Sequence, residues 1–243
     1  MEPFDRIALA ELRNWQRSMQ QRPSLINRAS KKVQDKINSY IPERVHRAIT
    51  VAIQKMIEGV LFGSRFISPK PLQERSLLER ESLVDNRVQM YRNTAVTEGA
   101  VTGAGGILLG LADFPLLLGI KMKMLYDIAA HYGYDLKDYR ERVYLLHIFQ
   151  LAFSSQRHRN QIYKKIENWE QIHESLPEKV EEFDWRTFQQ EYRDYIDLAK
   201  LAQLIPVIGA AVGAIANYKL INQLAATAKN AYRMRYFGRG DRG

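Results

Sequence analysis

Residues 97–119 read TEGAVTGAGGILLGLADFPLLLG, an apolar segment rich in glycine. Glycines crowd its first half, and an apolar run of twenty residues, 101–120, carries one charge, Asp113, and one proline, Pro115. A glycine inside a helix lowers helix stability by about 1 kcal/mol relative to alanine. Several glycines together therefore indicate that packing between helices compensates the loss. We interpret the stretch as closely packed helix rather than as a flexible linker.

The spacing of these glycines indicates how packing could compensate their cost. Several lie four residues apart, which puts small residues on one face of a helix and lets two helix backbones approach closely. These glycines are Gly99 and Gly103, Gly106 and Gly110, and, in the second half of the chain, Gly209 and Gly213. We therefore predict tight helix crossings at both places.

A second segment, residues 196–237, follows the same logic. It reads IDLAKLAQLIPVIGAAVGAIANYKLINQLAATAKNAYRMRYF and places Pro206 just before its two glycines. In both segments a polar helix leads in, small apolar residues with a proline follow, and an amphipathic helix leads out. We predict an all-α helical bundle with two apolar helical hairpins that contain glycine and proline.

The setting of the first apolar run stays open on sequence alone. About 20 apolar residues suffice to span a bilayer, but a charge such as Asp113 costs about 3 kcal/mol on insertion scales, and Pro115 removes a backbone hydrogen bond. An alternative is two short helices with a turn at residues 112–115, Asp113 capping the second. The sequence therefore leaves three placements of this run open: a buried hairpin, an interfacial or re-entrant insertion, and a helix that spans the membrane.

The rest of the chain also has helical periodicity, and sustained two-residue alternation is absent. We predict helices at residues 4–21, 25–40, 43–62 and 72–98, with a broad apolar stripe on the third. As domains we expect N-terminal basic amphipathic helices in residues 1–65, a helical domain in 72–237 and a disordered tail in 238–243.

Composition narrows the function classes. The 243 residues include no cysteine, which excludes disulfides, thiolate metal sites and cysteine nucleophiles. Residues 1–15 hold no apolar stretch of the kind found in signal peptides, so we expect a cytoplasmic protein. The net charge is +9, with basic N-terminal and C-terminal regions around an acidic stretch at residues 167–184. The C-terminal basic residues are Lys219, Lys229, Arg233, Arg235, Arg239 and Arg242.

Motifs that carry chemistry are missing. The five histidines have no helical metal-site spacing, and HExxH, a Walker loop and GxSxG do not occur. We predict no catalytic residue, no metal and no cofactor. The candidates for a polar site are Glu98, Asp113 and Asn217, which would meet in an apolar setting if the two hairpins pack together.

Three blocks of the chain resemble the EcsC family. They are residues 97–135, residues 141–149 (ERVYLLHIF) and residues 204–236, and the resemblance covers most of residues 91–236. The positions that match family motifs are Asp113, Pro115, Gly133, Asp135, Pro206, Gly209 and Asn217. The family takes its name from an operon that also encodes the ATPase and membrane subunit of an ABC transporter. The resemblance implies no enzymatic activity.

These observations favour a non-enzymatic helical protein at the inner face of the cytoplasmic membrane. Its basic helices would meet an anionic membrane surface, a glycine-rich hairpin would add apolar contact, and an ABC transporter or another membrane protein is the implied partner. One alternative is a soluble helical adaptor for a protein partner. Another is a hydrolase that uses Glu98 and Asp113. Nucleic acid is disfavoured, because binding would want aromatic side chains beside the basic ones, and residues 232–236 offer only a small site of this kind.

Overall fold

The computed structural model of the chain describes residues 2–21, 43–62, 70–103, 106–197, 201 and 210–240. Within these ranges the chain is helical, and an isolated bridge between Ser154 and Ile196 is the one strand-like pairing. The all-α prediction is confirmed. The helices are α1 Pro3–Gln20, α3 Glu43–Phe62, α4 Leu77–Gly103, α5 Gly106–His131, α6 Tyr139–Phe153, α7 Gln156–Glu167, α8 Trp169–Ser175, the short 3-10 helix Val180–Glu182, α9 Trp185–Tyr195 and α11 Ala210–Gly240.

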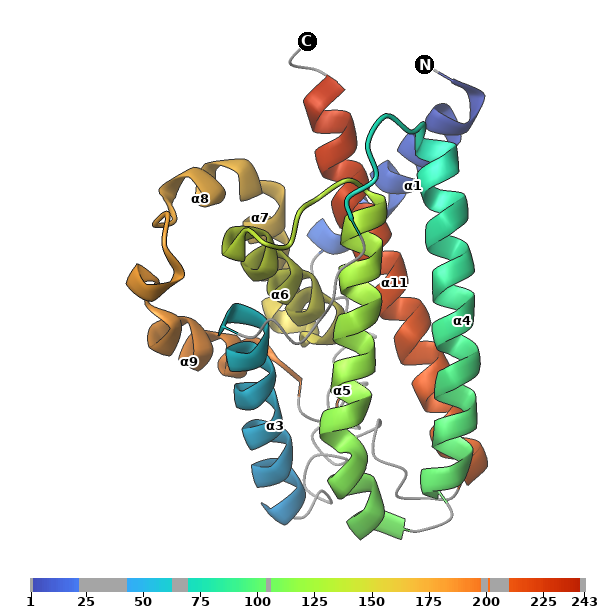
Figure 1. Ribbon diagram of the computed structural model, residues 1–243, viewed down its shortest axis with the longest axis vertical. Helices are drawn as coiled ribbons and strands as arrows, with labels where there is room; N and C mark the ends of the chain where they lie inside the picture. Colours follow the sequence, from blue (N-terminus) through green and yellow to red (C-terminus); the bar gives the residue numbers. More distant parts are fainter. Residues whose placement is uncertain are drawn as a thin grey trace.

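Three long helices form the body of the bundle (Figure 1). Helices α4 and α5 run antiparallel, and α11 packs against both of them and against α6. Helix α3 flanks α5 and α6, while α7, α8 and α9 form a lobe at the side of the bundle. The end of α4 and the starts of α3, α5 and α11 all lie at the lower end of Figure 1. Both glycine-rich segments therefore reach the same end of the molecule.

In helix α3 the apolar side chains predicted to share one face are the side chains that pack in the core. It begins at Glu43 and ends at Phe62, as the apolar periodicity predicts. Every residue of its predicted stripe is buried: Val45, Ile49, Ala52, Ile53, Met56, Ile57 and Val60. The predicted helix at residues 25–40 and the motif residues Pro206 and Gly209 lie outside the described ranges. At the other end of the chain, α11 continues to Gly240, into the segment expected to be a tail.

Helix α5 corrects one expectation. The turn considered at residues 112–115 is wrong, because α5 is continuous from Gly106 to His131 with Pro115 inside it. The chain instead reverses between Gly103 and Gly106, where α4 gives way to α5. Proline deprives a helix of one backbone bond, whereas a run of glycines loses helical preference at every residue. The glycine run is therefore the easier place for the chain to turn back.

The C-terminus of α5 is fixed by a glycine and an arginine. Gly133 has φ +90°, and its N–H donates to the carbonyl of Ala130 at 3.0 Å, as in a glycine C-cap. Arg80 of α4 reaches this turn, and its Nη1 donates to the carbonyl oxygens of His131 at 3.1 Å and Leu72 at 3.0 Å. The family-motif glycine thus serves a structural turn.

We expect Gly133→Ala to lower the free energy of unfolding by about 2–3 kcal/mol. Alanine strains a backbone at φ +90°, and its Cβ would lie 2.9 Å from both Arg80 Nη1 and the Leu72 carbonyl oxygen. Urea unfolding followed by circular dichroism measures the change. The matched control is Gly119→Ala inside α5, where a Cβ meets nothing within 4 Å and helix propensity predicts a gain of about 1 kcal/mol. Equal stability of the two variants would contradict this account.

Candidate functional site

Helix α11 carries a buried arginine, Arg235, near its C-terminal end. Its Nη1 and Nη2 donate to the two carboxylate oxygens of Glu141 at 2.5 and 2.8 Å, and its Nε donates to Glu170 at 2.9 Å. The guanidinium carbon lies 3.9 Å from the ring centre of Tyr134 and 4.8 Å from that of Tyr144. Burial alone would lower the pKa of Arg235, but the Glu141 carboxylate outweighs it and raises that pKa. The side chain is therefore a permanent cation that ties α11 to α6 and α8.

A second buried arginine, Arg233, joins α11 to α4. Its Nε and Nη2 donate to Glu81 at 2.6 and 2.7 Å, and its Nη1 donates to Glu11 of α1 at 2.8 Å. Glu81 also accepts a hydrogen bond from the Tyr132 hydroxyl at 2.9 Å and lies 3.2 Å from the Lys229 amine. These contacts hold four parts of the chain together: α1, α4, the turn after α5, and α11.

The two networks correct a prediction about the basic C-terminus. We expected the basic residues of this region to face an external surface, yet Arg233 and Arg235 are buried and bonded to carboxylates. Their donors already have partners inside the protein, so they offer no site for phosphate, lipid headgroup or nucleic acid. In each network a buried arginine joins helices through a charge-assisted bidentate pair, which is strong and geometrically specific. We call each network an ion-pair clamp: Arg235 with Glu141 is the first, and Arg233 with Glu81 is the second.

A buried histidine, His147, lies in the middle of α6. Its ring packs edge-on against Trp169 and Phe188, and its Nδ1 is 3.2 Å from the Gln150 side-chain oxygen. Burial, helped by the positive charge of Lys165, lowers the pKa of His147 to about 4. The imidazole is therefore neutral at pH 7.

The lowered pKa of His147 should make the free energy of unfolding fall as the pH falls. Its pKa is about 4 in the folded state and 6.5 ordinarily, so the unfolded chain binds the proton first as the pH falls. The stabilisation is complete above pH 6.5 and decreases between pH 6.5 and 4, by about 3 kcal/mol in all. Urea unfolding at a series of pH values measures the decrease. His147→Gln should flatten the curve in this window, and an unchanged slope would refute the assignment.

The predicted polar site is described only in part. Asn217 is buried, and its Oδ1 accepts a hydrogen bond from the Lys121 amine at 2.7 Å, which links α11 to α5. Glu98 and Asp113 belong to α4 and α5, but their side chains lie outside the described set. A meeting of these three groups stays a prediction, and so does the hydrolase that would need it. The same limit applies to the surroundings of Gly99, Gly103, Gly106, Gly110 and Gly213.

Two further polar contacts lie near this pair. The Tyr91 hydroxyl donates to Asp127 at 2.7 Å, and the Lys123 amine donates to the other oxygen of Asp127 at 2.6 Å. The Arg92 guanidinium lies 5.7 Å from the centre of the Tyr218 ring. Sequence reasoning did not single out these residues. Tyr91 and Arg92 precede the first apolar run, Lys123 and Asp127 follow it, and Tyr218 lies at the end of the second.

The described residues contain neither a cluster of metal-binding side chains nor a helix that could span a membrane. No three His, Asp or Glu side chains there group closely enough to hold a metal ion. None of the helices, over the same residues, has both the length and the sustained apolar character needed to cross a bilayer.

Comparison with known proteins supports the family resemblance. The model of the EcsC protein family matches residues 6–237. The chain is 46% identical to Protein EcsC of Bacillus subtilis (strain 168) over 232 residues, which is 95% of either chain. It is 28% identical over 216 residues to the uncharacterized protein YdbA of the same organism, covering 88% of this chain and 79% of that one. No solved structure matches. With nearly its whole length matched, the chain belongs to the EcsC protein family.

Proposed function

We propose that this protein is non-enzymatic and binds peripherally to the inner face of the cytoplasmic membrane through one end of its bundle. This helix-tip end consists of residues 95–103 of α4, 106–120 of α5 and 210–218 of α11. The observation that carries the proposal is the convergence of these segments at the lower end of Figure 1. Between Arg92 and Lys121 the chain holds two charged residues, and residues 201–218 hold none.

Exposed apolar side chains support this orientation. Leu116 of α5 is 59% exposed, and Tyr218 of α11 is 42% exposed. From Gly106 to Lys121 helix α5 rises about 22 Å, so its apolar part is long enough to reach through the headgroups into the acyl boundary. Interfacial helices bury their apolar face about 5–10 Å into that boundary. The depth needed is smaller than the length available.

The residues just above the helix-tip end have the chemistry of a membrane interface. Among the side chains that the structure describes, the first exposed or partly exposed charges beyond this end are Arg92 on α4, Lys123 on α5 and Lys219 on α11, and all three are basic. Arg92 covers the Tyr218 ring, and tyrosine is enriched at headgroup level in membrane proteins. Near an anionic leaflet each such cation contributes about 1 kcal/mol of attraction. The arrangement therefore favours anionic lipid.

Flotation with lipid vesicles tests the proposal. The intact chain should float with phosphatidylglycerol-containing vesicles at low salt and less with pure phosphatidylcholine. Leu116→Glu should weaken binding by about 2 kcal/mol, or roughly 30-fold, because a carboxylate replaces an inserted leucine. Leu78→Glu, at a leucine that is 46% exposed at the opposite end of α4, is the matched control and should float normally. An intact chain that stays unbound with both lipids would end the proposal.

The family resemblance adds a partner to this proposal. A protein held by its helix-tip end on the inner leaflet lies beside the cytoplasmic loops of membrane proteins, and an ABC transporter is the partner implied. Co-purification of tagged protein from detergent-solubilised membranes tests the association. Transporter subunits should be recovered with the intact chain and with Leu78→Glu. Loss of recovery in Leu116→Glu alone would show that the association needs the membrane contact.

A further inference from the structure

An aromatic pair, the exposed Phe62 and the partly buried Trp185, joins α3 to α9. Phe62, the last residue of α3, is 46% exposed, and its ring lies edge-on to Trp185 with 6.2 Å between ring centres. The Arg186 guanidinium lies 5.8 Å from the Trp185 ring centre. Tryptophan and arginine are the residues most enriched at the energetic centres of protein interfaces, and phenylalanine is enriched at interfaces generally. Such a grouping on an open surface indicates a contact site for another molecule.

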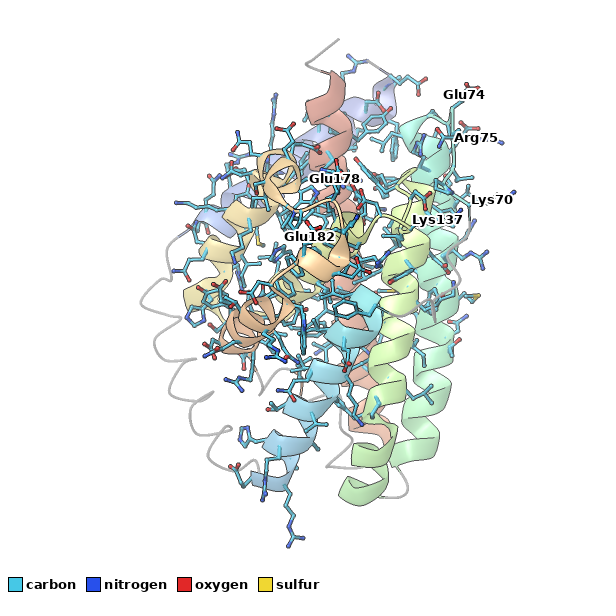
Figure 2. All side chains as sticks on the ribbon, turned by 60° about the vertical axis from the view of Figure 1, so that its left-hand side comes forward. Lys70, Glu74, Arg75, Lys137, Glu178 and Glu182 are labelled. Atoms are coloured by element: carbon cyan, nitrogen blue, oxygen red, sulfur yellow. The ribbon has the colours of Figure 1, made fainter. Side chains whose placement is uncertain are left out.

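The surface beside this pair is acidic. Residues 167–184 contain seven carboxylates and one lysine, in a chain whose net charge is +9. Glu174, Glu178, Glu181 and Glu182 are exposed, and among the described residues none of them has an ion pair within 4 Å. Figure 2 places Glu178 and Glu182 on the side lobe, beyond the C-terminal end of α3. Basic side chains also lie close by. They are Lys179 and Arg186, Arg142, whose Nη2 donates to the Leu61 carbonyl oxygen at 2.8 Å, and Arg140, which interacts electrostatically with Glu178.

We propose that this aromatic–acidic surface, formed by Phe62, Trp185, Glu178, Glu181 and Glu182, docks a basic amphipathic segment of a partner protein. Apolar side chains of that segment cover the two rings, and its lysines or arginines face the carboxylates. Charge complementarity carries the choice of occupant. Carboxylates that have no ion pair within 4 Å among the described residues repel anionic lipid and nucleic acid, and they steer a cationic peptide toward the rings.

This inference stands apart from the proposed membrane contact. The helix-tip end is basic at its margin and turned to the lower end of Figure 1, whereas the aromatic–acidic surface lies beside the end of α3 and on the side lobe. Failure of vesicle binding would leave the docking surface intact, and failure of docking would leave the membrane contact intact. Together the two surfaces would let one chain bridge a membrane and a basic protein segment.

Fluorescence anisotropy with two labelled peptides tests the docking surface. The first is an 18-residue peptide with leucine and lysine at helical spacing, and the second has glutamate in place of every lysine. The basic peptide should bind the intact chain at micromolar concentration and the acidic peptide should not. Phe62→Ser, and separately Glu181→Lys with Glu182→Lys, should each weaken binding at least about tenfold.

Matched variants separate the surface from the rest of the molecule. Ile7→Ser changes a residue that is 59% exposed on α1, and Glu74→Lys reverses a charge on the loop before α4, away from Glu178 and Glu182 in Figure 2. Both should bind the basic peptide as the intact chain does, and circular dichroism should show every variant folded. Equal binding by all variants would overturn the proposal. So would analytical ultracentrifugation showing a dimer that Phe62→Ser abolishes, because a second copy would then be the occupant.

Discussion

Arg235→Ala is expected to lower the free energy of unfolding by about 4 kcal/mol, because removing one member of a buried ion pair strands the other. The Glu141 carboxylate would lose both of its bonds to the guanidinium and remain buried. The planar group between the Tyr134 and Tyr144 rings would leave a cavity as well. Guanidinium chloride unfolding measures the loss.

Companion variants tell a stranded charge from a missing side chain. Arg235→Met with Glu141→Leu removes both charges and fills the space, so it should recover most of the lost stability. Arg235→Lys should fall between, because lysine keeps the charge but loses the bidentate and stacked contacts. Arg193→Ala, at an exposed arginine 3.8 Å from Asp194, should change stability by less than about 0.5 kcal/mol. An Arg235→Ala protein as stable as the Arg193→Ala protein would contradict the clamp.

Local periodicity predicted α1, α3 and α4, because it reports which face of each helix is buried. The stripe of α3 was readable in full, and its bounds agree with the structure. The apolar run of α5 was readable too, but the place where the chain reverses was not. Both Pro115 and the glycines near Gly103 disfavour helix, and the packing of α4 along α5 and α11 decides between them. That packing is a long-range property.

The ion-pair clamp was not predictable from single segments. Glu81 and Arg233 lie 152 residues apart, and a charge run by itself reads as exposed surface. A local signal did exist, because Arg235 sits in the sequence YRMRY near the end of a helix, and residues two apart on a helix face different directions. Two arginines among aromatic residues on different faces need separate partners. Identifying Glu81 and Glu141 as those partners requires the fold.

Glu81 is the residue on which the second clamp depends, and Glu81→Leu should lower the free energy of unfolding by about 4 kcal/mol. The change removes both carboxylate bonds to buried Arg233, the partner of Lys229 and the acceptor of the Tyr132 hydroxyl. Glu11 and Asp85 are exposed, so each offers its cation a weaker, solvent-screened substitute. Chemical unfolding of the variant beside Asp85→Leu, which removes only the exposed carboxylate, isolates the buried contribution. Comparable losses in the two variants would show that burial of the pair adds nothing.

Protonation of Glu81 should cause a second loss of unfolding free energy at acid pH, distinct from the loss that His147 causes. Burial raises the pKa of Glu81, but the hydrogen bonds from Arg233 and the charge of Lys229 outweigh it, so that pKa lies below its ordinary 4.5. A lowered carboxylate pKa gives stability that is complete above pH 4.5 and is lost as the pH falls through the folded-state value. The histidine loss begins near pH 6.5 and is complete near pH 4, so the Glu81 loss continues where it ends. His147→Gln should abolish the upper step and keep the lower one, and Glu81→Gln should do the reverse. Loss of both steps in either variant would mean that one cooperative group controls acid unfolding.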